Sequence, residues 1–448
     1  MRANYRGDLV LESGVLEGGY LSVENGRINY VGSEKPPIAD IEREWDGAWI
    51  FPGGVDAQVH ARSQKGAEGF DACTRAAAAG GVTTIVDMPY DEEYLVCSAE
   101  SVRMKASDAE REARVDVALY GTINPDEGAA RIREQVEAGV AAFKFSTFGT
   151  HPKRFPRVPP YLMERAFSEI AKHGLAAGVH NENDEIIRHE MKTVSDRGIT
   201  DYTAHGLSRP PISELLAICE IYELGAHTGC RAHVVHCSLA RGIDIRTSYR
   251  KQGFACSVEV CLHYLVLTEE DDVRRLGGLG KINPPIRSRS EREGLWTRLA
   301  SGEIDIVSTD HVSWPLERKS NPEMLANASG APGIEVMIPI LARECDSRGV
   351  CLGTLARVLA GNPARHFGLA PSKGSLKPGA DADFCVIDPA TSPYRAARGQ
   401  TVAGWSAYEG REIPKVLATY LRGQCVWDGS EIVQPRGFGR FVRPAQAR

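Results

Sequence analysis

The sequence predicts an α/β fold, a (β/α)₈ TIM barrel joined to a small β-sandwich domain that the two ends of the chain build together. Three observations predict it. Short apolar runs alternate with helical stretches from about residue 50 to about residue 375. Strand-like segments precede this region, and others follow it. Alternation of strand and helix over this length is typical of parallel β/α units, and their number suits an eight-stranded barrel.

The terminal segments show β patterning. Residues 8–11 form a short apolar run, and residues 20–32 alternate around Asn25-Gly26. An Asn-Gly pair between alternating segments favours a hairpin, because its turn needs a positive φ at both positions. Strand-like runs return at residues 383–388 and 416–420. We therefore expect residues 1–50 and 375–448 to form one composite β-sandwich domain, and residues 51–374 to form the barrel.

The central region supplies the expected barrel strands. The apolar runs lie at residues 84–88, 141–145, 176–180, 232–236, 254–261 and 304–310. Alanine-rich stretches at residues 72–80 and 129–138, which we expect to be helical, precede the first two.

Composition excludes several classes of function. The 448 residues include 53 Lys+Arg and 59 Asp+Glu, a formal charge of −6, so no basic excess predicts nucleic-acid binding. The mean hydropathy is −0.26, and no apolar run approaches the ~20 residues that span a bilayer. The N-terminal residues lack the apolar core of a secretory signal. The 11 cysteines form no Cys-x-x-Cys pair, which favours a cytoplasmic protein with reduced thiols.

Polar residues that are rare in buried strands stand at or near the ends of these apolar runs. They are His60, Lys144, His180, His236 and Asp310. Because barrel strands all point the same way, their C-terminal ends meet at one face, where barrel enzymes hold their catalytic residues. Imidazole and carboxylate ligands suit Zn²⁺ or a similar ion. Lys144 would contribute only if reaction with CO₂ converted it to an anionic carbamate.

Several motifs carry a resemblance to a known family. Residues 51–60 resemble the Pro-Gly-x-x-Asp-x-His-x-His opening of the amidohydrolase superfamily. Further segments are similar to the cyclic amidohydrolases, the group of hydantoinase/dihydropyrimidinase, allantoinase and dihydroorotase. They are residues 78–89, 143–144, 179–182, 205–210, 235–238, 281–287, 308–311, 362–369 and 373–383.

The resemblance implies a binuclear metal site and a hydrolytic mechanism. One divalent ion, zinc with manganese or cobalt as alternatives, would bind His60, carbamylated Lys144 and Asp310. The second would bind the same carbamate, His180 and His236. A metal-bound hydroxide would attack a ring amide carbonyl, with Asp310 as general base and then general acid. The resemblance also implies that Asn283 holds the ring amide through its backbone, and that the chain forms a homodimer or homotetramer.

Gln58 departs from the motif, because it stands where the first histidine of His-x-His is expected. Residues i and i+2 of a strand point to the same face, so Gln58 should still face the metal beside His60. Its amide oxygen is a weaker zinc ligand than an imidazole. We therefore hypothesise that the first metal is weakly held or absent and that the second is retained, which leaves one or two ions. Alternatively, Gln58 marks a degraded, non-catalytic site.

Other departures concern the substrate. Gly149 occupies the position of a hydantoinase tyrosine, which makes ordinary hydantoins less suitable. Arg62 has the offset of a dihydroorotase arginine that binds a carboxylate, although Tyr90 replaces the asparagine that accompanies it. Arg62 could equally form an ion pair at the barrel rim. His263 and His311 are expected to line the site. These residues suggest an anionic cyclic amide or ureide.

Three functions compete. The first is metal-dependent hydrolysis of a cyclic C–N bond. The second is a non-catalytic assembly protein like the relatives of dihydropyrimidinase that lost their ligands. The third, a deaminase of the same superfamily, lacks the expected His-x-x-Glu motif. Retention of Lys144, His180, His236 and Asp310 favours the hydrolase.

Overall fold

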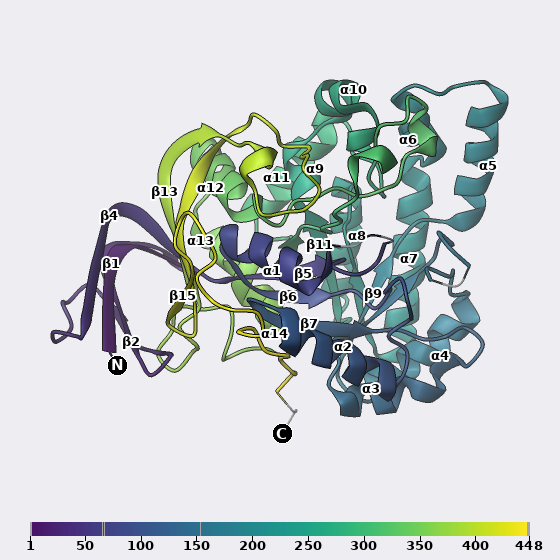
Figure 1. Cartoon of the computed structure of the whole chain (residues 1–448). Coiled ribbons are helices and arrows are strands. Elements are labelled where there is room, and N and C mark those ends of the chain that lie inside the picture. Colours follow the sequence, from purple (N-terminus) through teal and green to yellow (C-terminus); the bar gives the residue numbers. More distant parts are fainter. Residues whose placement is uncertain (1, 65, 67, 153, 446–448) are drawn as a thin grey trace.

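The computed structural model describes residues 2–64, 66, 68–152 and 154–445. Two sheets organise it, a parallel barrel and a separate mixed sheet to which both ends of the chain contribute (Figure 1). The predicted fold class, a (β/α)₈ TIM barrel with a smaller β domain, is confirmed. The proposed domain boundaries near residues 50 and 375 stay a prediction.

The barrel consists of eight strands in chain order, and each pairs in parallel with the next. A bridge between Val59 and His311 brings the first strand next to the segment that follows the last. Nearly every strand residue is buried, because helices cover the outside and side chains fill the inside. The strands are β5 (Gly54–Val59), β6 (Val82–Asp87), β7 (Asp116–Gly121), β8 (Ala142–Ser146), β9 (Ala176–His180), β10 (Arg231–Val234), β11 (Cys256–Cys261) and β12 (Ile306–Ser308).

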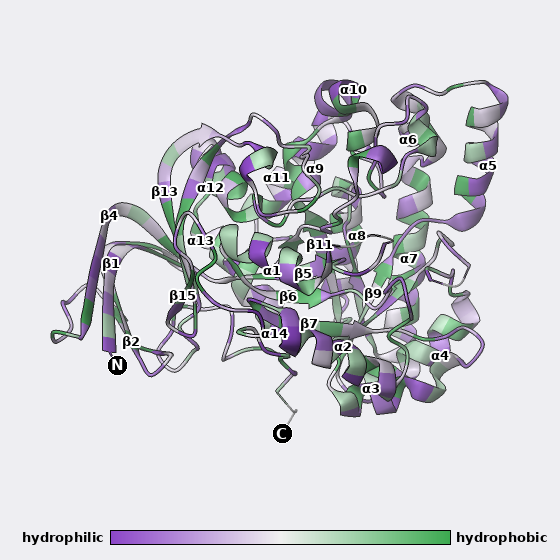
Figure 2. Ribbon diagram, viewed as in Figure 1, coloured by the Kyte–Doolittle hydropathy of each residue, from purple (hydrophilic) through white to green (hydrophobic). Residues whose placement is uncertain are grey.

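Helices follow the strands and surround the barrel (Figure 1). Those of ten residues or more are α1 (Gly69–Ala79), α2 (Ala99–Glu112), α4 (Pro160–Ala171), α5 (Asp184–Asp196), α7 (Pro211–Thr228), α8 (Ala240–Lys251), α11 (Arg289–Ala300) and α12 (Met337–Arg348). Hydrophilic and hydrophobic residues mix along α4 and α5 (Figure 2), as expected of helices that bury one face.

Shorter helical segments occupy the connections. They are η1 (Gly128–Arg131), α3 (Ile132–Ala138), α6 (Thr203–Ser208), α9 (Leu262–Val266), η2 (Glu269–Val273), α10 (Arg274–Leu276), η3 (Gly277–Gly280), η4 (Leu316–Arg318), η5 (Met324–Ala326), α13 (Gly353–Ala356), η6 (Arg357–Gly361), α14 (Asn362–His366) and η7 (Ala396–Arg398).

The second sheet has seven strands, and its order is β15-β14-β13-β4-β1-β2-β3. Only the β1–β4 pair is parallel among the pairings of this sheet. Phe384 and Tyr420 stack in its core and Tyr5 packs edge-on against both, so residues from both ends of the chain share one apolar cluster. The strands are β1 (Arg2–Leu11), β2 (Gly14–Glu24), β3 (Arg27–Gly32), β4 (Ile41–Pro52), β13 (Phe384–Pro393), β14 (Glu412–Leu421) and β15 (Gln424–Trp427).

Buried ion pairs join the two sheets. Lys373 is 4% exposed at its side chain, and its Nζ lies 2.5 Å from Asp116 and 2.8 Å from Asp383. Asp116 begins barrel strand β7, whereas Asp383 directly precedes β13 of the mixed sheet. Arg422 also contacts Asp116, at 2.6 Å. This network fixes the base of the barrel against the second sheet.

Most sequence-based elements agree with the structure. The Asn25-Gly26 hairpin is confirmed, with φ of 51° and 80° at the two positions. The apolar run at residues 176–180 coincides with β9. Strands β7 and β15 were not anticipated from the sequence. The run at residues 232–236 extends too far, because β10 ends at Val234. Within the described residues, no helix is long and apolar enough to cross a membrane.

Candidate active site

A cavity of about 520 Å³ opens where the barrel strands end. Most of the predicted site residues form its wall, although they come from elements far apart in the sequence. They are Gln58, His60, Tyr90, Lys144, His180, His236, Asn283 and Asp310, together with Gly149. Arg62, His263 and His311 are not part of this wall.

Asp310 lies between His60 and Gln58 on one side of the cavity. His60 Nε2 is 3.2 Å from Asp310 Oδ1, and Ser63 Oγ holds the other ring nitrogen of His60 at 2.8 Å. Gln58 Nε2 donates to the same Oδ1 at 2.7 Å. The amide oxygen of Gln58 is buried and has no hydrogen-bond partner among the described residues. Gln58 thus directs its nitrogen, which cannot bind a metal, toward the carboxylate.

His180 and His236 face each other across the cavity floor. His180 Nδ1 lies 2.8 Å from His236 Nε2. The second nitrogen of His180 is 2.8 Å from Glu182 Oε2, and Arg209 binds the same carboxylate oxygen. A carboxylate on the outer nitrogen is the usual way in which proteins orient a metal-binding histidine. Glu182 and Arg209 therefore set the direction of the His180 ring.

The backbone is strained at two of these residues. His236 has a φ of 41° and Asp310 a φ of 48°, in the left-handed region that non-glycine residues seldom adopt. His236 lies two residues after the end of β10, and Asp310 lies two residues after the end of β12. Such conformations cost about 1–3 kcal/mol and cluster at functional sites. The strained backbone turns both side chains into the cavity.

Burial and neighbouring charges shift the pKa values of the titratable groups in the site. Burial would raise the pKa of the Asp310 carboxyl, but the hydrogen bond and charge of His60 outweigh it and hold that pKa well below its usual value. Burial lowers the pKa of Lys144 to about 8, against the opposing effect of Asp310. Burial also lowers the pKa values of His180 and His236. The two histidines are therefore neutral, the form that binds metals.

The donors fit one divalent ion better than two. His180 Nδ1 and His236 Nε2 lie 2.8 Å apart. Lys144, from β8, lines the same cavity and donates from Nζ to the Phe145 carbonyl at 3.2 Å. On the other side, Gln58 donates a hydrogen bond to Asp310 where a second imidazole would be needed. Among the described residues, that side retains His60 and Asp310 as its own donors.

Arg62 requires a correction. Its side chain contacts Asp91 at 3.2 Å and Glu93 at 3.9 Å, and it also binds Asp108 of α2. The expected role in substrate binding rested on the resemblance to the dihydroorotase arginine, but three carboxylates already surround the Arg62 guanidinium. Arg62 therefore forms an ion pair network at the barrel rim, the second of the two interpretations.

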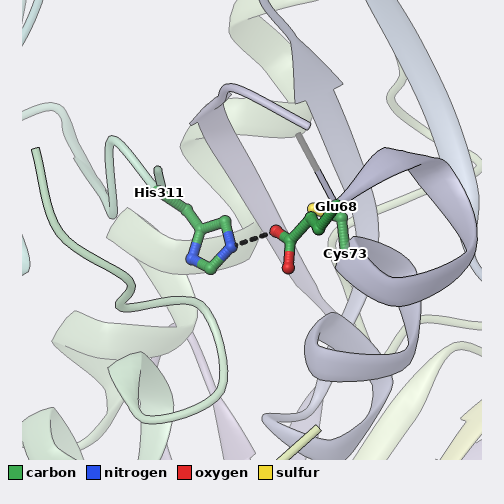
Figure 3. A group of neighbouring side chains, drawn as sticks. All are labelled: Glu68, Cys73 and His311. Carbon is green, nitrogen blue, oxygen red and sulfur yellow. Dashed lines mark hydrogen bonds and ion pairs between the residues drawn. The ribbon is translucent and has the colours of Figure 1, made fainter. Parts of the chain in front are cut away.

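His311 does not line the cavity, and its ring points toward Glu68 (Figure 3). Its Nε2 is 2.5 Å from Glu68 Oε1, and its Nδ1 accepts a hydrogen bond from the Gly333 backbone at 3.1 Å. Cys73 completes a buried group whose polar atoms lie within 4.8 Å of one another. Both ring nitrogens of His311 are used, so this residue anchors the segment that follows Asp310.

The remaining predicted residues differ in their placement. Asn283 lines the cavity, and its buried Oδ1 has no partner among the described residues. The Tyr90 hydroxyl donates to the Lys144 carbonyl at 3.2 Å, so Tyr90 presents its ring to the cavity. His263 is buried outside the wall, and burial lowers its pKa to about 4. Gly149 lines the cavity, and a Cβ at this position would lie 3.3 Å from Arg188 Nη2.

The chain is similar to known proteins along most of its length. The model of the amidohydrolase family matches residues 49–414 of this chain. The chain belongs to the amidohydrolase family. An allantoinase from Rubrobacter xylanophilus is 34% identical, with 98% of each chain covered. An L-hydantoinase from Paenarthrobacter aurescens is 30% identical over 97% of this chain and 96% of its own.

Solved structures agree with this assignment. The L-hydantoinase (dihydropyrimidinase) from Arthrobacter aurescens matches with a TM-score of 0.93 at 29% identity, covering 98% of this chain and 99% of that one. The resemblance to the cyclic amidohydrolases is therefore confirmed at the level of the family.

Sequence reasoning missed part of this amidohydrolase site. Glu182 and Arg209 lie within matched segments, yet only their contacts with His180 reveal what they do. Arg154 and Arg318 also line the cavity. They lie in connections after β8 and β12, where no periodicity or motif indicates a direction for the side chain.

Proposed function

We propose that this amidohydrolase hydrolyses a C–N bond of a cyclic amide or ureide in a metal-dependent reaction. The observation that carries the proposal is the contact of His180 with His236 at 2.8 Å in the cavity that Lys144 and Asp310 also line. The names of its relatives, allantoinase and L-hydantoinase, support the choice of a cyclic substrate. A degraded scaffold has no reason to keep this set together with the strained backbone at His236 and Asp310.

His180, His236 and Lys144 would hold the ion, with zinc as the expected metal and manganese or cobalt as alternatives. We expect Lys144 to act as a carbamate, because an ammonium group would repel a cation. A bound divalent ion would lower the pKa of water and polarise the carbonyl of the substrate. His60 and Asp310 would contribute a weaker second position, which Gln58 leaves incomplete.

Asp310 is placed to move the proton. Both Gln58 Nε2 and His60 Nε2 contact its Oδ1. Its Oδ2 is therefore available to accept a proton from water and to pass it to the leaving ring nitrogen. Gln58 has a positioning role in this arrangement, because its hydrogen bond fixes which carboxylate oxygen faces the substrate. Asn283, on the cavity wall, would contact the ring amide.

A ring-opening assay tests the proposal. The purified full chain would be supplied in turn with Zn²⁺, Mn²⁺ and Co²⁺ and assayed on allantoin, dihydroorotate, hydantoins, dihydrouracil and cyclic imides. We expect turnover of at least one ring, loss of activity on chelation and recovery when the metal returns. No turnover with any combination would contradict the proposal and favour the non-catalytic assembly protein.

Metal content tests the role of Gln58. We expect the zinc-loaded wild-type chain to retain about one equivalent of zinc after dialysis against metal-free buffer, since only one position has a full donor set. Gln58→His should retain about two equivalents, because it supplies the missing imidazole. Elemental analysis of both proteins measures this. Gln64→His is the matched control, because Gln64 lines the same cavity but bonds to the Ser313 carbonyl. Two tightly held equivalents of zinc in the wild type would contradict the hypothesis that Gln58 weakens the first metal position.

A further inference from the structure

The wall of the cavity is strongly cationic. Beside Lys144, five basic side chains line it, whereas Asp310 is the one carboxylate among the described lining residues. The basic residues are Arg154, Arg188, Arg209, Lys281 and Arg318. The chain as a whole carries a formal charge of −6, so this positive charge is local to the cavity. A site of one sign of charge attracts ligands of the other.

Three of these cations already have strong partners. Arg209 binds Glu182, and Arg188 Nε contacts Asp184 at 2.6 Å. Lys281 donates to the carbonyls of Leu325, at 2.7 Å, and Asn327. Burial, together with the nearby Arg209, lowers the pKa of Lys281 to about 8. These groups shape the wall, but their donors are largely occupied.

Arg154 and Arg318 have no carboxylate partner among the residues that the structure describes. Arg154 Nη1 donates to the Ser63 carbonyl at 2.9 Å, which occupies one of its five N–H groups. The Arg318 guanidinium lies 5.4 Å from the centre of the Trp314 ring. A guanidinium with open N–H groups forms two parallel hydrogen bonds with a carboxylate.

Arg154 is tied to the reacting end of the cavity. Ser63, which binds Arg154 through its carbonyl, binds His60 through its hydroxyl at 2.8 Å. The next residue, Phe155, packs on Tyr90 with ring centres 4.3 Å apart and lies 6.0 Å from the His60 ring. These contacts hold the loop near His60. Arg154 and Asp310 thus line the same cavity, and Ser63 and His60 connect the two side chains.

We propose that the cavity selects cyclic amides whose ring substituent ends in a carboxylate, and that Arg154 receives this carboxylate with help from Arg318. The proposal rests on the proposed ring-opening function. It places the anion site on the loop between β8 and α4, whereas the sequence had suggested Arg62. Arg62 is occupied by three acidic residues, so it cannot take this role.

A pair of substrates of equal shape and different charge tests the proposal. The probes are 5-(carboxymethyl)hydantoin and 5-(carbamoylmethyl)hydantoin, assayed with the metal-loaded full chain. We expect kcat/KM to favour the carboxylate by about 10-fold or more, as for other charge-assisted hydrogen bonds. Equal kcat/KM for the two probes, or a preference for the amide, overturns the proposal and leaves the ring-opening function intact.

Variants assign the effect to residues. Arg154→Gln should abolish the preference for the carboxylate through KM, whereas Arg154→Lys should restore part of it, because a charge remains without the planar fork. Arg318→Gln should reduce the preference less. Arg157→Gln is the matched control, because Arg157 is an exposed arginine of the same loop that does not line the cavity. Equal loss on both probes in Arg154→Gln would indicate a merely structural role and contradict the proposal.

Binding measurements keep the test independent of turnover. Isothermal titration with N-carbamoyl-aspartate and N-carbamoyl-asparagine, the ring-opened forms of the two probes, should show tighter binding of the former to the wild type. Arg154→Gln should bind both alike. Absence of a difference in the wild type overturns the anion site. Absence of turnover with a retained binding difference would instead contradict the hydrolase function alone.

Discussion

Replacement of Asp310 by asparagine is expected to lower kcat for ring opening by about 10²–10⁴-fold, the usual contribution of a general acid–base group. The amide keeps the size of the side chain but cannot accept the proton from water or return it to the leaving nitrogen. Because the hydrogen bonds of Gln58 and His60 already occupy Oδ1, the loss falls on the chemistry more than on binding. Steady-state kinetics on the best ring from the metal-dependent assay measures it.

Asp305→Asn provides the matched control. Asp305 directly precedes β12, whereas Asp310 follows its end, so the two carboxylates lie at opposite ends of the same strand. Asp305 contacts Arg250 at 2.9 Å, away from the cavity. Its replacement should leave kcat per folded molecule unchanged. Full activity of Asp310→Asn at unchanged metal content would show that another group moves the proton.

Replacement of Lys373 by methionine should destabilise the protein by about 3–5 kcal/mol, the cost of leaving buried charges without their partner. Lys373 Nζ lies 2.5, 3.1 and 2.8 Å from Asp116, Asp381 and Asp383. Burial would lower the pKa of Lys373, but these carboxylates outweigh it and raise that pKa above its usual value. Urea unfolding followed by circular dichroism measures the loss in stability.

The loss of stability caused by Lys373→Met should depend on pH. Burial raises the pKa of Asp383 even with Lys373 present, and removal of the ammonium raises it further. A carboxyl whose pKa is higher in the folded state than in the unfolded state binds protons preferentially when folded, so stability falls as pH rises. The variant should therefore lose least near pH 4, about the pKa of an unfolded aspartate, and most at neutral pH. Lys377→Met, at an exposed lysine of the same segment, is the control. A loss below about 1 kcal/mol would contradict the assignment.

The regular strands and turns could be predicted from the sequence, because they depend on local patterns of residues. Apolar runs such as residues 176–180 are buried on both faces, which gives the pattern of a barrel strand directly. The Asn25-Gly26 turn was likewise visible, because its two positive φ values require particular residue types. Strand β7 gives a weaker signal, because its apolar run from Val117 to Tyr120 is only four residues long and lies between Asp116 and Gly121, two residue types that are depleted in strands.

The sequence predicted those site residues that lie at the ends of barrel strands. His60, Lys144, His180, His236 and Asp310 meet as expected because parallel strands share one C-terminal face. Residues beyond the strand ends have no such common direction. Arg62 turns toward α2, and His311 turns away from the cavity toward Glu68. Arg154 and Arg318 enter the cavity from connecting segments, whose path depends on contacts that no local pattern encodes.

The position of β4 in the mixed sheet bears on how the protein is made in a cell. β4 ends at Pro52, and its hydrogen-bonding partner β13 begins at Phe384. A ribosome that adds about 5–20 residues per second needs on the order of tens of seconds to reach that partner. Until then the edge of β4 that contains Trp49, Ile50 and Phe51 is unpaired, the kind of surface that recruits other nascent chains. Expression of this protein should therefore depend on chaperones that protect the N-terminal strands until translation is complete.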